Sequence, residues 1–134
     1  MNCVSLLMGL DAGTLKEKPT AKLEIMRLSK LAGEPFVVTL QAVSARRYTE
    51  LVNNVTDKKG VVDSGKAYQA YVMVALAGMV DPPMKDKDIQ EHYGCSTPEE
   101  LLETIFTGGE ITMIAERITD LSGMSGNVVR EVKN

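Results

Sequence analysis

Residues 65–80 read GKAYQAYVMVALAGMV, and this run decides how the rest of the chain is organised. Beyond its single lysine it contains no charged side chain, and its length suits a helix of about four turns. A helix that is apolar on every side is stable when other elements surround it. We therefore predict a central core helix over residues 66–80, capped by Asp63 or Ser64 and stopped by Asp81-Pro82-Pro83.

The length of the chain fits a single soluble domain, and its charge and hydropathy argue against nucleic-acid and membrane partners. Its 134 residues are enough for one domain that buries about two thirds of its unfolded surface. The net charge is −3 and the pI is about 5.2, so the chain lacks the basic excess that phosphate backbones attract, and we expect no nucleic-acid partner. No run approaches the ~20 apolar residues of a membrane span, and we expect no membrane partner.

The inventory of reactive side chains is small. Cys3 and Cys95 are too few for a disulfide scaffold, and no secretory pattern precedes the first, which favours a reducing cytoplasm. His92 is the only histidine, and no CxxC, HExxH, GxSxG or phosphate-loop motif occurs. We therefore predict no catalytic, cofactor-binding or metal-binding residue. A small enzyme that acts through Cys95 or a carboxylate remains as a third-ranked alternative.

Two strand-like runs precede the helical part of the chain. Residues 22–28, KLEIMRL, and residues 36–43, FVVTLQAV, alternate between the two faces of a strand, the second run more regularly than the first. Gly33 and Pro35 lie between them and indicate a loop. The pattern predicts a β-hairpin over about residues 22–43. Because an isolated hairpin is marginally stable in water, this hairpin must pack on the helices that follow.

The spacing of apolar residues from Ser44 onwards predicts five helices. They cover residues 44–55, 63–80, 85–93, 97–106 and 111–121. Thr97, with Pro98 after it and Glu100 three positions on, is a capping box at the start of the fourth. We interpret Gly108-Gly109 as an interhelical turn and Gly123 as a C-terminal cap with positive φ. The predicted fold class is α+β and mostly α, with an N-terminal β-hairpin packed on a bundle of about five helices.

The two ends differ in composition from the middle. We predict an N-terminal arm or short helix over residues 1–19, one globular domain over residues 20–123, and a flexible tail over residues 124–134. Each end carries an apolar cluster too small to fold alone, as in segments that order on a partner. Methionines in predicted loops or at helix ends (Met8, Met84 and Met124) suit adaptable contacts. The candidate partner-binding residues are Leu6, Leu7, Met8, Met124, Val128 and Val129.

The order of several motifs resembles that of the XkdN-like tail assembly chaperones of tailed phages and defective prophages. The motifs are RLSKLAGEPFVVTLQAVS (27–44), MVDPP (79–83), Tyr93-Gly94, Thr97-Pro98-Glu99-Glu100, and GGEIT (108–112) through Leu121-Ser122-Gly123. The resemblance covers about residues 20–124. It implies no catalytic residues, and it marks Pro82, Pro98, Gly109 and Gly123 as positions that punctuate the fold.

The resemblance also implies a non-enzymatic role in building a long phage tail, in the cytoplasm of the bacterial host. Such chaperones hold the tape-measure protein in a soluble state and recruit tail-tube subunits, so these two proteins are the implied partners. Self-association into a homo-oligomer is left open. The alternative function is a structural tail or tail-completion component of the virion, and a nucleic-acid regulator ranks below the small enzyme.

Overall fold

The structure of the chain is a computed structural model that describes residues 2–53, 55–56 and 58–133. Met1 and Asn134, at the outer ends of the predicted arm and tail, lie outside the described residues. So do Asn54, within the predicted helix 44–55, and Asp57, in the loop that follows it.

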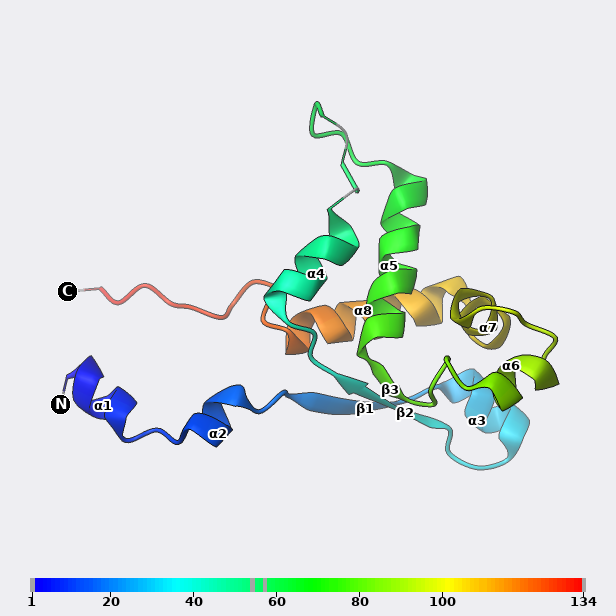
Figure 1. The fold of residues 1–134 in the computed structure, drawn as a ribbon, viewed down its shortest axis with the longest axis horizontal. Helices are drawn as coiled ribbons and strands as arrows, with labels where there is room; N and C mark the ends of the chain where they lie inside the picture. The colour runs from blue at the N-terminus through cyan, green and yellow to red at the C-terminus, as the bar shows by residue number, and fades with distance from the viewer. Residues whose placement is uncertain (1, 54, 57, 134) are drawn as a thin grey trace.

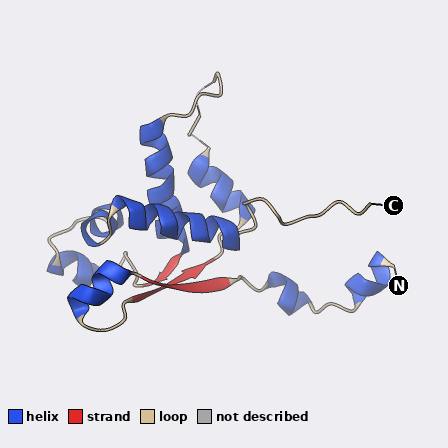
Figure 2. Cartoon of the chain, turned by 180° about the vertical axis from the view of Figure 1, so that it is seen from behind, coloured by secondary structure: helices blue, strands red, loops and turns tan. Residues whose placement is uncertain are grey.

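The described residues form eight helices and one antiparallel sheet of three strands (Figure 1 and Figure 2). In chain order the elements are α1 (Cys3–Met8), α2 (Ala12–Lys16), β1 (Thr20–Glu24), α3 (Met26–Ala32), β2 (Val37–Gln41), α4 (Ala45–Val52), α5 (Ser64–Gly78), β3 (Met79–Asp81), α6 (Lys87–His92), α7 (Pro98–Ile105) and α8 (Gly108–Leu121). Helix α8 packs on β1 and β2, and α5 crosses α8 (Figure 1). The fold is therefore mixed α+β.

The sheet is built from apolar side chains that face the same way. The strands pair in the order β1–β2–β3. The register places Leu23 opposite Val38, Ala21 opposite Leu40, and Leu40 opposite Met79. Because side chains opposite one another lie on the same face of a sheet, these residues make one apolar face. Val38 and Leu40 are fully buried there, as the alternation of the second strand-like run predicts.

The predicted β-hairpin is right in its antiparallel pairing and wrong in its details. Residues 26–32 form helix α3, where the sequence pattern indicated the end of a strand and a loop. Most of the side chains in α3 favour a helix, and Gly33 ends it with a φ of 79°, which suits glycine. The Ser29 hydroxyl accepts a hydrogen bond from the Phe36 N–H and so ties α3 to the start of β2. The third strand, β3, was not predicted.

The prediction of about five helices is too low. The five predicted helices correspond to α4–α8. Helices α1 and α2 lie in the segment that was predicted to be an arm or short helix, and α3 was not predicted. The observed bounds differ from the predicted ones by up to three residues. Helix α4 already stops at Val52, α5 stops at Gly78 because the chain then enters β3, and α8 begins three residues earlier than predicted, at Gly108.

The interpretation of Gly108-Gly109 as a turn is wrong, because these glycines form the first turn of α8. Thr107 accepts a hydrogen bond from the Glu110 N–H at 3.2 Å, and the Glu110 carboxylate accepts one from the Thr107 N–H at 2.8 Å. This reciprocal capping offsets the low helix propensity of the two glycines. At Thr97 only half of the predicted capping box forms, since the Glu100 carboxylate accepts from the Ser96 N–H instead.

The core lies where α5 crosses α8. The predicted apolar stripe of α8 is confirmed, because Ile111, Ile114 and Ile118 are all fully buried. Helix α5 reaches this stripe at Gly78, where an added Cβ would lie only 2.6 Å from both Cγ2 and Cδ1 of Ile118. No side chain could occupy that space without displacing Ile118. The glycine is therefore what allows the two helices to approach so closely.

An arginine joins α3 to the junction between α7 and α8. Arg27 donates to the Glu110 carboxylate through Nε at 3.2 Å and Nη2 at 2.9 Å, and to the Ile105 carbonyl at 2.7 Å. The hydrogen bonds from Arg27 hold the pKa of the Glu110 carboxyl below its ordinary value against the opposing effect of burial, and the hydrogen bond from the Thr107 N–H adds to the lowering. The same pair raises the pKa of the Arg27 guanidinium. The ion pair whose pKa values are shifted therefore has a structural role, because it links α3 to the junction of α7 and α8.

Replacing Glu110 with glutamine is expected to lower the free energy of unfolding at pH 7 by about 0.5–1 kcal/mol, because the charge is lost while a capping side chain remains. The folded-state pKa of Glu110 is depressed, so its charge stabilises the fold above the ordinary value of 4.5. That contribution disappears as the pH falls through the lower, folded-state pKa. Urea titrations of both proteins over a pH series should therefore converge in acid. A difference that does not change with pH would contradict this role for the pair.

Candidate partner-binding surfaces

Neither a candidate metal site nor a membrane-spanning helix is present in the described part of the chain. Among residues 2–53, 55–56 and 58–133, no three His, Cys, Asp or Glu side chains are placed to hold a metal ion. Within the same residues, no helix has the length and apolar character needed to span a membrane. The Cys95 thiol lies 3.4 Å from the Thr104 hydroxyl and 3.6 Å from the Tyr93 carbonyl, neither of which is a base that would activate it.

The N-terminal segment presents apolar side chains that its own domain leaves uncovered. Asn2 and Asp11 cap α1 and α2 with side-chain hydrogen bonds, so this segment is helical in two short pieces. Every residue of both helices is exposed. The predicted contact residues Leu6, Leu7 and Met8 share α1 and are 55%, 60% and 81% exposed. Exposed apolar side chains gathered on one helix mark an interaction surface better than scattered ones do.

The C-terminal segment has a similar character without helical structure. Residues 124–133 form neither helix nor strand. The predicted contact residues Met124, Val128 and Val129 are 40%, 63% and 89% exposed. Both terminal segments extend from the body towards the same side (Figure 1 and Figure 2). All six predicted contact residues are therefore available to a partner, and none is packed in the core.

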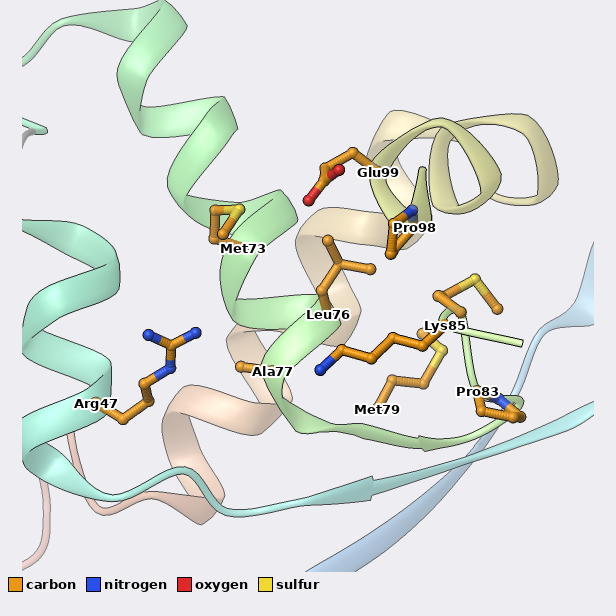
Figure 3. A pocket seen from close by; sticks show the side chains of 10 residues that line it. Arg47, Met73, Leu76, Ala77, Met79, Pro83, Lys85, Pro98 and Glu99 are labelled. Carbon is orange, nitrogen blue, oxygen red and sulfur yellow. The ribbon is translucent and has the colours of Figure 1, made fainter. Parts of the chain in front are cut away.

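A second apolar surface lies on the body of the molecule, along the outer side of α5. Met73, Leu76 and Ala77 follow one another at helical spacing and line a cavity of about 330 Å³ (Figure 3). Met79 and Met84 also line it and are almost fully buried. We call this cavity the α5 groove. The prediction of Met84 as a surface contact is wrong in its exposure, since only 4% of the residue is accessible.

The prediction that other elements surround α5 holds on one side only. Val74, Ala75 and Gly78 are buried on the side towards α8, whereas the side with Met73 and Leu76 is only partly covered. The groove was not predicted, because which side of an apolar helix stays partly uncovered depends on tertiary packing. The apolar residues at positions 73, 76 and 77 share one side of an almost wholly apolar helix. This pattern is the sequence signal that indicates the groove.

One wall of the α5 groove is held in place by a buried amide. The Gln90 side chain is 2% exposed, and its Nε2 donates to the Met84 carbonyl at 2.8 Å. Buried polar groups persist when they are hydrogen-bonded, so this bond fixes the backbone between β3 and α6. Pro83 and Lys85, which flank Met84, line the groove from this segment. Gln90 was not singled out by the sequence analysis, because an isolated glutamine carries no local signal.

Charged side chains stand at the edges of the groove. Arg47 comes from α4, Lys85 from the segment after β3, and Glu99 from the first turn of α7 (Figure 3). Arg47 is 3.6 Å from Glu50 on its own helix, and both side chains are more than half exposed. The groove therefore offers an apolar floor with opposite charges at different parts of its rim.

The chain is similar to a known protein family and to a solved structure. The family model described as phage XkdN-like tail assembly chaperone protein matches residues 4–133. The crystal structure of the protein YqbN is similar, with a TM-score of 0.57 and 20% sequence identity, over 87% of this chain and 98% of that one. At this identity the likeness to YqbN shows a shared fold alone. Among curated proteins there is no significant match in sequence.

The Gln90→Leu substitution is expected to lower the free energy of unfolding by about 1–3 kcal/mol, because the buried Met84 carbonyl then loses its donor. Glu91→Leu is the matched control, since Glu91 is the exposed neighbour on the same helix. Urea denaturation of the two variants measures the difference. A Gln90→Leu protein as stable as the control would show that this amide does not hold the wall of the groove.

Proposed function

Because the chain belongs to the family of phage XkdN-like tail assembly chaperones, we propose that it binds the tape-measure and tail-tube proteins of a phage or prophage and promotes tail assembly. The observation that carries this proposal is the family match over residues 4–133, which includes the body and most of both terminal segments. A chaperone family is not a class of enzymes, and the proposed action is reversible binding. Its proposed location is the cytoplasm of the bacterial host.

The exposed ends support the choice of partner. A tape-measure protein is a long, apolar, helical chain that would aggregate unless a partner covers it. Leu6, Leu7 and Met8 on α1 could pack on such a helix as one amphipathic helix packs on another. Val128 and Val129 add apolar surface on the same side of the body. We therefore propose these terminal clusters, with Met124, as contact sites.

Co-expression of the chain with the tape-measure protein encoded beside it tests the proposal. Serine replaces Leu6, Leu7 and Met8 in one variant and Val128 and Val129 in another. The soluble fraction of the tape-measure protein should fall at least about fivefold in each, because contact residues near the centre of an interface carry most of the binding energy.

The control for this experiment is the double variant Met26→Ser and Leu31→Ser on α3, whose residues are 66% and 75% exposed but lie outside both ends. It should leave tape-measure solubility unchanged. If the unaltered chain does not solubilise the tape-measure protein, the proposed function is wrong. If it does so and both end variants act equally well, the function stands and the assignment of the ends is wrong.

A further inference from the structure

The rim of the α5 groove carries positive side chains at one part and a negative side chain at another. Arg47 and Lys85 reach towards one another across Ala77, while the Glu99 carboxylate stands beyond Leu76 at another part of the rim (Figure 3). These side chains come from three separate elements, so the fold alone brings them to one apolar floor. A segment that fits this groove must complement both the apolar floor and the charges of the rim.

The positive part of the rim continues past the groove. An adjoining hollow of about 290 Å³ shares Arg47, Ala77 and Lys85 with the α5 groove and adds Lys18 from the chain before β1. Among the described residues that line this hollow there is no carboxylate. Three cations thus gather along one edge of a chain whose net charge is −3. The positive charge is therefore local to this surface, because the chain as a whole is negative.

The cations remain available to a partner. The ion pair between Arg47 and Glu50 is 3.6 Å long and exposed, and such pairs contribute little to stability. Charge complementarity of this kind selects partners and their orientation more than it adds affinity. If a partner segment packs its apolar side chains on Leu76, a carboxylate beside those side chains lies close to Arg47 and Lys85.

We propose that the α5 groove binds an amphipathic helix of a partner protein, with apolar side chains on Met73 and Leu76 and carboxylates at the end that faces Arg47 and Lys85. Met73 is partly exposed in the groove, and its unbranched thioether can adapt to the shape of a helical ligand, while Met79 and Met84 are almost fully buried and support the groove from below. This inference deepens the proposed function, because it gives the chaperone a binding surface apart from its two ends and states the chemistry of the segment that it accepts.

A pair of fluorescent synthetic peptides tests the inference on the full chain. Each has about 15 residues with leucines at helical spacing, and they differ in carrying either two glutamates or two lysines at one end. Fluorescence anisotropy measures their dissociation constants. The glutamate peptide should bind at least about tenfold more tightly than the lysine peptide, and the preference should shrink in high salt. The double variant Arg47→Glu and Lys85→Glu should reverse the order of the two peptides.

Lys30→Glu is the matched control, because Lys30 is exposed on α3 and does not line the groove. It should leave both dissociation constants unchanged. The inference is overturned if neither peptide binds, if both bind equally, or if Lys30→Glu weakens binding as much as the groove variant does. The peptides contain no tape-measure sequence, so any of these results removes the groove assignment while the co-expression experiment still decides the proposed function.

Discussion

The structure depends on the close approach of α5 and α8 at Gly78. The space that a Cβ would need is occupied by Ile118, which is fully buried and branched at its own Cβ, so it has little freedom to move aside. The chain leaves the helix directly after this glycine and enters β3 with Met79. The same crossing therefore sets both the core above the sheet and the position of the segment that forms one wall of the α5 groove.

This arrangement gives α5 two sides that differ in burial. The side of Val74, Ala75 and Gly78 is buried in the core, while the side of Met73 and Leu76 is only partly covered and lines the α5 groove. Gln90 anchors one wall of the groove, and the ion pair of Arg27 with Glu110 joins α3 to α8. The chain belongs to a family of phage tail assembly chaperones, and its described residues leave apolar side chains exposed at both ends and partly uncovered along α5.

Local signals in the sequence were sufficient for much of the fold. The apolar stripe from Ile111 to Ile118, the cap at Thr97 and the positive φ of Gly123 each depend on near neighbours, and each was predicted. Helix α3 was missed because seven residues give too little periodicity to separate a helix from a strand. The exposed ends could be anticipated from composition. The groove could not, since Arg47, Met73 and Lys85 meet only through tertiary packing.

A double-mutant cycle on Gly78 and Ile118 tests the central claim about the helix crossing. Gly78→Ala alone should lower the free energy of unfolding by about 1–2 kcal/mol, because overpacking outweighs the gain in helix propensity. In an Ile118→Ala background, the atoms that would collide with the new methyl group are absent, so Gly78→Ala should be neutral or stabilising. The same loss of stability in both backgrounds would show that this contact does not govern the approach of the two helices.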